Sequence, residues 1–410
     1  MAKRGALVGL DIGTTKVCVI VAEHSEDGEV HITGMGTSPS VGVRKGVVVD
    51  LDATTRAIEE AVDKAERMAG LRLSTAVVGV SGGHLASQNS RGVVAVSRAD
   101  HEIGEQDVAR VVEAARMAAV PASDREIVHL LPRDFVVDGQ DGVKSPVGMY
   151  GTRLEVEAHI VTGASTLLAN LLKCVGRAGL ECDALVLEPL ASGEAVLSPA
   201  ERELGVALVD IGGGTISLGL FASGGLCYTV VLPYGGNHVT NDIAMGLRTS
   251  FGDAERLKIR HGCALPQQVG EDELIEVVHV GSHELRVAPK RALSEIIEPR
   301  VSEMAGLVKA QCGRSGWAYR IPAGLVITGG TALLRGLPDL ISERLGMAVR
   351  VGVPDVPGSM ADTVSSPTFA TGVGLVLHAA RQRRVGRSLN GNGTVYGRVR
   401  QWLREFTLGA

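Results

Sequence analysis

Two short glycine-containing segments carry the residue types that a nucleotide site needs, and each of them opens with an aspartate. The first turn runs from Asp11 to Thr15, followed by Lys16, and the second from Asp210 to Thr215. Turns of small residues bring backbone N–H groups close to phosphate oxygens at little steric cost. Carboxylates suit magnesium, which keeps most of its water shell. The pattern therefore predicts a site for ATP and Mg²⁺ in which Asp11 and Asp210 face each other across a cleft, holding the metal mostly through water. The residues expected around the phosphates are Gly13, Thr14, Thr15, Lys16, Gly212, Gly213, Gly214 and Thr215.

The surrounding sequence indicates that these turns belong to a duplicated unit. Stretches rich in β-branched residues, typical of strands, flank both turns: Ala6–Leu10, Val17–Val21, Gly205–Val209 and Ile216–Phe221. Two strand-turn-strand units that share Asp-Ile-Gly, about half the chain apart, predict two related lobes. Each hairpin taken alone has a simpler interpretation, in which it merely reverses the chain. A third segment, Gly329-Gly330-Thr331 after the apolar strand Leu325–Thr328, is suited to lie under a nucleoside.

Other periodic segments predict the elements that position these turns. Helices are expected over Thr54–Met68, Ala164–Arg177, Ala254–Arg260 and Arg291–Lys309. Residues 84–162 have a separate pattern of predicted strands and one helix, so they are expected to form a small α/β subdomain inserted into the first lobe. The expected domains are the first lobe at 1–83 and 163–200, the insert at 84–162, the second lobe at 201–378 with a small upper subdomain at about 246–328, a basic linker at 379–393, and a helix at 394–407.

Composition narrows the classes of function. The 410 residues are 45% hydrophobic and 21% charged, as in soluble globular proteins, and the six cysteines are scattered without a metal or disulfide pattern. The net charge is −5, yet residues 381–410 hold seven arginines against one acid. We therefore expect no nucleic-acid partner for the body of the protein, and an anionic surface touched by the C-terminal segment alone.

The three loops together resemble the superfamily of actin, sugar kinases and heat-shock chaperones. The fold class expected from this resemblance is α/β: an actin-like two-lobed ATPase fold of duplicated ribonuclease-H-like domains, with an inserted α/β subdomain and a C-terminal amphipathic helix. The resemblance implies that Glu188, in Leu187-Glu188-Pro189, orients the attacking water. It also implies that Glu255 and Lys258 contact the ribose and base, alongside Gly329 and Gly330. Without the resemblance, Glu255 and Lys258 would be interpreted as a solvated helix face.

Within that superfamily the sequence is similar to the FtsA family of bacterial cell-division proteins. The matching segments are Gly42–Gly46, Pro146–Gly151 leading to Arg153-Leu154-Glu155 and His159, Gly235-Gly236 with Thr240, Asp242 and Ile243, and Ile297–Arg300 with Glu303. The resemblance implies self-assembly, a second lobe that binds the C-terminal tail of FtsZ, and an insert that meets later division proteins. Arg300 is the candidate for acidic side chains on the FtsZ tail; alternatively, it pairs with Glu303 on its own helix.

The C-terminal segment predicts a membrane anchor. On a helix, Val395, Val399, Trp402, Leu403 and Phe406 share one face, and Arg400 and Arg404 lie opposite. So short a helix is marginal in water, so we expect it to fold as it docks on anionic lipids at the cytoplasmic face of the inner membrane, at the division site. The alternative is that it packs on its own protein.

Two other functions are compatible with the sequence. A pilus-assembly ATP-binding protein shares the insert but generally lacks such an anchor, and a small-molecule kinase of the same fold needs a substrate pocket that no further motif indicates. ATP is expected to act mainly as a structural and assembly ligand, with hydrolysis slow at most, because actin has an amide where this chain has Glu188.

Overall fold

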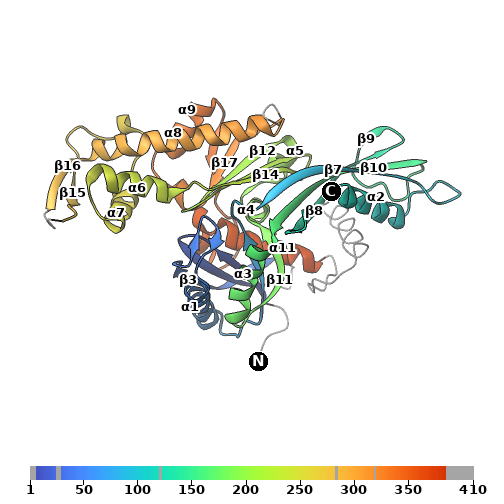
Figure 1. Ribbon diagram of the computed structural model, residues 1–410, viewed down its shortest axis with the longest axis horizontal. Helices are drawn as coiled ribbons and strands as arrows, with labels where there is room; N and C mark the ends of the chain where they lie inside the picture. Colours follow the sequence, from blue (N-terminus) through green and yellow to red (C-terminus); the bar gives the residue numbers. More distant parts are fainter. Residues whose placement is uncertain (1–5, 25–28, 120–121, 282–284, 318–319, 385–410) are drawn as a thin grey trace.

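The computed structural model describes residues 6–24, 29–119, 122–281, 285–317 and 320–384. Each of its two lobes is built on a five-stranded sheet (Figure 1). The first-lobe sheet has the order β11-β6-β1-β2-β3, with β1 (Leu7–Ile12), β2 (Lys16–His24), β3 (Val30–Pro39), β6 (Thr75–Val80) and β11 (Glu181–Leu187). The second-lobe sheet has the order β14-β13-β12-β17-β18, with β12 (Val206–Ile211), β13 (Ile216–Ala222), β14 (Gly225–Leu232), β17 (Leu325–Thr328) and β18 (Val349–Val351).

The two sheets share one topology, which confirms the predicted duplication. In the first lobe β1 pairs antiparallel with β2 and parallel with β6. In the second lobe β12 pairs antiparallel with β13 and parallel with β17. The predicted turns are shorter than expected, because Asp11 pairs with Cys18 and Asp210 pairs with Ser217 inside the strand ladders. Both aspartates are therefore the second-last residues of rigid strands.

Helices cover the first-lobe sheet. The predicted helix near 54–68 is α1 (Leu51–Ala69), which begins at Asp50, whose carboxylate accepts a hydrogen bond from the Ala53 N–H, and ends at Gly70 in the left-handed region. Its buried face includes Ile58, Ala61 and Val62, as the spacing predicts. The other short elements of this lobe are β4 (Val43–Arg44), β5 (Val47–Val48) and α3 (Ser165–Arg177).

The insert is a four-stranded sheet with one helix and its own apolar core. Its elements are β7 (Ala86–Ala95), α2 (Glu105–Ala118), β8 (Arg125–Val137), β9 (Gln140–Val143) and β10 (Arg153–Ala164). Although it is inserted into the first lobe, it packs against β14 of the second: the Ser87 hydroxyl donates to the Thr229 carbonyl (2.6 Å), and the buried His159 ring lies 3.3 Å from the Thr229 hydroxyl. Figure 1 shows it projecting beside the second lobe.

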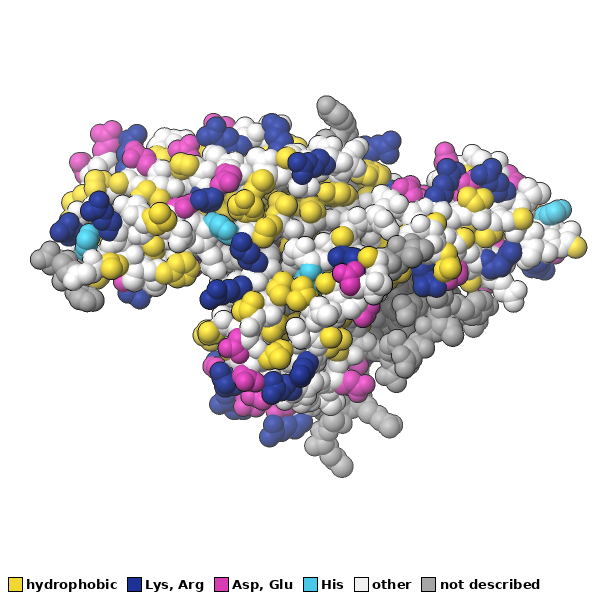
Figure 2. All heavy atoms as spheres, viewed as in Figure 1, with side chains coloured by type: hydrophobic (Ala, Val, Ile, Leu, Met, Phe, Trp, Pro, Cys, Tyr) yellow, Lys and Arg dark blue, Asp and Glu magenta, His cyan; other side chains and the backbone are white. Residues whose placement is uncertain are grey.

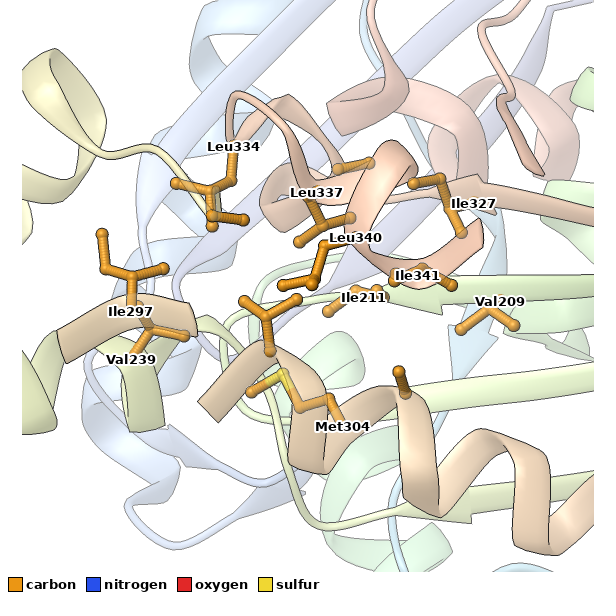
Figure 3. Close-up of a cluster of buried hydrophobic side chains, with 14 of the residues drawn as sticks. Val209, Ile211, Val239, Ile297, Met304, Ile327, Leu334, Leu337, Leu340 and Ile341 are labelled. Carbon is orange, nitrogen blue, oxygen red and sulfur yellow. The ribbon is translucent and has the colours of Figure 1, made fainter. Parts of the chain in front are cut away.

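The second lobe carries a helical subdomain at its other end. The long helix α8 (Lys290–Arg314) and the smaller elements α6 (Gly236–Leu247), α7 (Phe251–His261), β15 (Leu274–Val278) and β16 (Leu285–Pro289) form this arm. Its core continues into the sheet: Figure 3 shows side chains of α9 (Leu337–Leu345) directed at Ile211 and Ile327, with Ile297 and Met304 of α8 on the other side. The short helices α5 (Pro199–Leu204) and α10 (Ala361–Val364) complete the lobe.

Two helices pack against each other between the lobes, α4 (Glu188–Val196) and α11 (Ala370–Arg384). They approach so closely that a Cβ on Gly374 would lie 1.8 Å from the Ala191 carbonyl oxygen. Helix α11 also packs on β1, β2 and β6, so the end of the predicted second lobe lies on the first. The linker predicted from residue 379 begins later, because Ala379 and Ala380 are buried within α11, which runs to Arg384.

The predicted amphipathic helix and the remainder of the linker lie outside the described residues. Within the described ranges, no helix combines the length and the apolar composition that crossing a membrane requires.

Candidate nucleotide site between the lobes

The two predicted phosphate turns have the same backbone geometry. In the first, the Gly13 N–H donates to the Lys16 carbonyl (3.0 Å), and in the second the Gly212 N–H donates to the Thr215 carbonyl (2.9 Å). Each turn thus closes directly behind the strand that carries its aspartate. Because the two turns share this geometry, each lobe presents the same set of backbone groups at the boundary between the lobes.

The two turns touch each other. A Cβ on Gly213 would lie 2.3 Å from the Thr15 methyl carbon, and one on Gly214 would lie 2.6 Å from the Thr14 hydroxyl oxygen. In the described part of the chain, no acceptor is paired with the backbone N–H groups of these four residues. Because buried N–H groups are nearly always hydrogen-bonded, and Gly214 is buried, the facing turns form a concentration of donors suited to an anion.

Three carboxylates converge beside the turns. Burial raises the pKa of Asp11 to about 6; the nearby charge of Asp210 adds to this rise, and Lys16 opposes it. Burial, with the charges of Asp11 and Asp210, raises the pKa of Glu188 to about 8. Burial also raises the pKa of Asp210. Burial is thus the main cause for all three carboxyl groups, and in addition Asp210 disfavours the ionisation of Asp11, and both aspartates disfavour that of Glu188.

Hydroxyl groups hold two of these carboxylates. Ser192 and Thr371 each donate to Asp210 Oδ2, at 3.0 and 3.1 Å, and their own oxygens lie 2.9 Å apart. Ser217 donates to Glu188 Oε2 at 3.0 Å. The Ser217 hydroxyl in turn lies 3.1 Å from that of Ser81, which follows β6 in the first lobe. Since Ser217 is on β13 and Glu188 opens α4, this chain of hydrogen bonds joins the two lobes.

Lys16 lies at the site with its ammonium group engaged by the chain itself. Its Nζ donates to the Thr368 carbonyl at 2.6 Å and lies 4.2 Å from the centre of the Phe369 ring. Both partners directly precede α11. A cation–π contact of this kind is weak beside a full charge pair, so phosphate oxygens would compete for Lys16 effectively.

The predicted adenosine elements line the second-lobe side. Gly329, at φ 85°, lies so close to Asp210 that a Cβ there would be 2.3 Å from Oδ1. Gly330 begins a single 3₁₀ turn over Gly330–Leu333. The neighbouring Thr331 hydroxyl donates to the Gly212 carbonyl at 3.0 Å. The strand-to-glycine transition thus packs the third loop directly against the second phosphate turn.

Glu255 and Lys258 form an ion pair of 2.7 Å on α7. Lys258 Nζ also reaches the Thr240 hydroxyl (2.9 Å) and the Gly236 carbonyl (3.3 Å), and Thr240 donates to Glu255. The Gly236 N–H donates to the Gly212 carbonyl at 2.9 Å. These side chains are therefore fixed beside the phosphate turns rather than spread on a solvated face, in contrast to the simpler interpretation.

The carboxylates of Asp11, Asp210 and Glu188 are oxygen donors of the type that magnesium takes. Across the described ranges, no group of three or more His, Cys, Asp or Glu side chains is arranged to hold a metal ion. The charges of Asp11 and Asp210 raise the pKa of Glu188, and the nearby Lys16 ammonium lowers the pKa of Asp11, so a further cation beside these groups would favour their ionised forms. Magnesium, which takes oxygen ligands and retains several waters, would fit beside these carboxylates. Figure 2 shows the surface hollowed between the arm of α6 and α7 and the first lobe, with Lys and Arg side chains at its edge.

Arg300 lies apart from this site, on α8. Its guanidinium forms two hydrogen bonds to Asp242 of α6, at 2.6 and 3.0 Å, and a further bond to Glu303. The pairing with Glu303 that was the simpler interpretation is thus present, and Asp242 adds a bidentate partner. An acidic peptide would have to replace carboxylates that Arg300 already holds.

Sequence reasoning missed Ser81, Ser192, Ser217 and Thr371, which contact the predicted carboxylates. Ser217 had a usable signal, because it occupies the position equivalent to Cys18 in the duplicated hairpin. Ser192 and Thr371 had none, because each is a single hydroxyl residue between small neighbours of its own helix and no local pattern marks it.

The duplicated sheets, the paired turns and the interlobe helices define an actin-like protein. Solved structures with this fold include the PilM–PilN type IV pilus biogenesis complex, at TM-score 0.65 and 19% identity over 91% of this chain and 98% of that one. Another is MreB5 of Spiroplasma citri bound to ADP, at TM-score 0.55 and 13% identity over 90% of this chain and 95% of that one. At these identities the likeness shows the fold alone.

Sequence relatives define the family. The model of cell division protein FtsA matches residues 207–374, and that of the SHS2 domain inserted in FtsA matches 82–162. The chain is 44% identical to cell division protein FtsA of Pseudomonas aeruginosa over 97% of both chains, and 44% identical to that of Bacillus subtilis over 93% of this chain and 85% of the relative. The chain belongs to the FtsA family of cell division proteins.

Proposed function

We propose that the protein clamps Mg-ATP between its lobes and self-assembles on the inner face of the cytoplasmic membrane, where it tethers FtsZ filaments and recruits later division proteins through the insert. The observation that carries the nucleotide part is the contact between Gly213 and Gly214 of one turn and Thr14 and Thr15 of the other, with three carboxylates beside them and with N–H groups that have no acceptor among the described residues. MreB5, of the same fold, has been solved with ADP and with AMPPNP, which supports the assignment.

In this function each group of site residues has its own binding role. The N–H groups of both turns bind the phosphates, and Lys16 leaves Thr368 to join them. Asp11 and Asp210 hold the waters of Mg²⁺, whose charge would offset theirs. Gly329 and Gly330 support the base, and Glu255 and Lys258 bind the ribose side. A bound Mg²⁺ would supply positive charge beside the phosphates.

Hydrolysis is expected to be slow. Glu188, which we propose orients the attacking water, has a pKa raised to about 8 by burial and by the neighbouring aspartates, so its protonated form is favoured at neutral pH until a cation offsets those carboxylates. We expect turnover well below the roughly 1 to 100 per second of dedicated phosphoryl-transfer enzymes. ATP then acts as the ligand that holds the lobes together, and the kinase alternative has no supporting observation. The pilus-type alternative is not favoured, because the relatives at 44% identity are division proteins.

Calorimetry tests the nucleotide site. Asp210→Ala should weaken Mg-ATP binding by about 100-fold, because the carboxylate and its hold on metal-bound water are lost together. Asp339→Ala, the same change at an exposed position on α9 of the second lobe, is the matched control and should bind as the wild type does. Unchanged affinity in Asp210→Ala would refute the two-turn site.

Liposome sedimentation tests the membrane part. Deleting residues 394–410, or changing Trp402 and Phe406 together to Glu, should abolish binding to anionic vesicles and leave ATP affinity intact. Changing Arg400 and Arg404 to Ala should weaken binding by an amount that falls with salt, because their attraction is screened beyond a Debye length of about 8 Å. If the truncated chain sediments as well as the full chain, Val395, Val399 and Leu403 are not part of an anchor.

Binding of a peptide with the FtsZ C-terminal sequence tests the partner surface. Arg300→Ala should weaken binding of that peptide if Arg300 exchanges Asp242 and Glu303 for the peptide's acids. Arg344→Ala is the matched control, because Arg344 also reaches an α8 carboxylate, that of Glu298 at 3.2 Å. Equal affinities of the wild type and both variants would remove Arg300 from the surface.

A further inference from the structure

The Asp210 carboxylate is held by elements outside its own sheet. Asp210 is near the end of β12, yet both hydroxyls that donate to it come from the helices between the lobes, Ser192 from α4 and Thr371 from α11. All three residues are buried, with exposures of 8%, 0% and 6% for Asp210, Ser192 and Thr371. Buried hydrogen bonds to a carboxylate are directional and strong, so this pair determines how the group is oriented.

The two oxygens of Asp210 have different surroundings. The hydrogen bonds found for this side chain in the described residues all go to Oδ2. Oδ1 faces Gly329, where a Cβ would come within 2.3 Å of it. Both hydroxyls lie within hydrogen-bond distance of Oδ2 and of each other, so this three-membered network occupies that oxygen from the helix side. Oδ1 is therefore the oxygen left for a metal-bound water.

The helices that supply the hydroxyls are locked to each other and to the other site elements. Ser192 and Thr371 lie 2.9 Å apart, and the Ala191–Gly374 contact leaves no space for a side chain between α4 and α11. Just before α11, the Pro367 carbonyl accepts from the Gly329 N–H (3.1 Å) and the Thr368 carbonyl accepts from Lys16 (2.6 Å). A shift of α11 would thus move the partners of Asp210, Gly329 and Lys16 together.

We propose that Ser192 and Thr371 are positioning residues that fix the Asp210 carboxylate for its contact with metal-bound water, and so make magnesium-dependent nucleotide binding depend on the packing of α4 against α11. The inference rests on the proposed nucleotide function. It assigns to two hydroxyls in the interlobe helices a role that the phosphate turns alone do not supply.

The test separates the metal-dependent part of binding from the rest. ATP affinity is measured by calorimetry in excess MgCl₂ and in EDTA for the wild type, Ser192→Ala, Thr371→Val and Thr371→Ser. A change that disorients a metal-holding group typically costs about 10- to 100-fold, so the ratio of the affinity in magnesium to that in EDTA should fall about tenfold in Ser192→Ala and Thr371→Val. It should stay near the wild-type value in Thr371→Ser, which keeps the donor.

A matched variant and a stability measurement test whether Ser192 and Thr371 act only by stabilising the fold. Thr249→Val removes another buried threonine hydroxyl, one that donates to the Val278 carbonyl at 2.6 Å, and should leave the ratio unchanged. Melting temperatures without nucleotide are recorded for all variants. If Ser192→Ala and Thr371→Val lower affinity equally in magnesium and EDTA, or leave both unchanged, the proposal is overturned. If the wild type itself binds no Mg-ATP, the proposed function fails instead.

Discussion

The two duplicated hairpins keep one backbone and carry different side chains. Asp11 and Asp210 stand at equivalent ladder positions, opposite Cys18 and Ser217. In the described residues no side-chain hydroxyl donates to Asp11, whereas Asp210 accepts from two. The first hairpin instead continues with Lys16, the cation that opposes the rise in the pKa of Asp11.

This difference shows which features each lobe contributes. Strand pairing and the tight turn are backbone requirements, so both copies retain them. The side chains differ between the two copies. The first hairpin carries the positively charged Lys16, and the aspartate of the second contacts hydroxyl groups of the interlobe helices. Lys16 thus lowers the pKa of both carboxylates, whereas hydroxyl donors from the described residues reach only the second. Four changes test that contrast.

The largest effect should come from removing the charge on either aspartate. Asp11→Asn and Asp210→Asn should each weaken Mg-ATP binding by about 100-fold, measured by calorimetry, because both carboxylates hold the metal's waters. The amide introduced by Asp210→Asn retains an oxygen that accepts from Ser192 and Thr371, so this variant should keep the wild-type melting temperature. Wild-type affinity in either variant would show that one hairpin suffices.

The next effect should come from the contact between the turns. Gly214→Ala places a methyl group against Thr14, whose hydroxyl accepts from the Gly46 N–H at 3.2 Å and is thereby held in place. The turns should separate, and ATP affinity in fluorescence titration should fall about tenfold, because the displaced N–H groups no longer reach the phosphates together. Adding Thr14→Gly should recover part of the loss; no recovery would mean that the turns do not need this contact.

Stability should depend on pH through the crowded carboxylates. The pKa of Glu188 is about 8 in the folded chain against an ordinary value of 4.5. Between these values the folded state binds a proton that the unfolded state has lost, so the free energy of unfolding falls as pH rises. Asp11, with a pKa of about 6 against 3.8, adds to the fall only at the acidic end.

Urea denaturation without nucleotide at pH 5, 6.5 and 8 measures this dependence. Glu188→Gln should flatten the decline up to about pH 8. Asp11→Asn should flatten it most below about pH 6 and by a smaller amount above, because the Asp11 charge also raises the pKa of Glu188. Magnesium with ATP should flatten the wild-type curve, because a cation offsets the same charges. Parallel curves for wild type and both variants would contradict the assigned electrostatics.

The smallest effect should come from exchanging the residues opposite the aspartates. Cys18 is buried with a pKa raised to about 12, so Cys18→Ser places a hydroxyl in apolar surroundings and should cost about 1 to 3 kcal/mol of stability by urea denaturation. ATP affinity should change little. Ser217→Cys should instead weaken the hydrogen bond to Glu188 and lower any residual hydrolysis; a larger affinity loss in Cys18→Ser than in Ser217→Cys would reverse the contrast.

Local sequence was sufficient for the parts of the site that depend on backbone. The glycine turns, the aspartates before them and the strand Leu325–Thr328 that precedes Gly329 were predictable, because turn chemistry and β-branched runs act over a few residues. Even there the strand ends moved: Asp11 and Asp210 lie within the ladders, since pairing with Cys18 and Ser217 extends them.

The interlobe contacts were decided by the tertiary structure. Thr371 lies 161 positions from Asp210 in the sequence, and no periodicity marks it as the partner of a carboxylate. The end of α11 looked like the start of a basic linker, yet Ala379 and Ala380 are buried. The composition of this stretch shows the arginines around these two alanines, and it does not show that the alanines are buried. Hydrogen bonds and burial between distant residues arise when the lobes close on α4 and α11, so their partners are set by the packed fold, while the turns are set by their own residues.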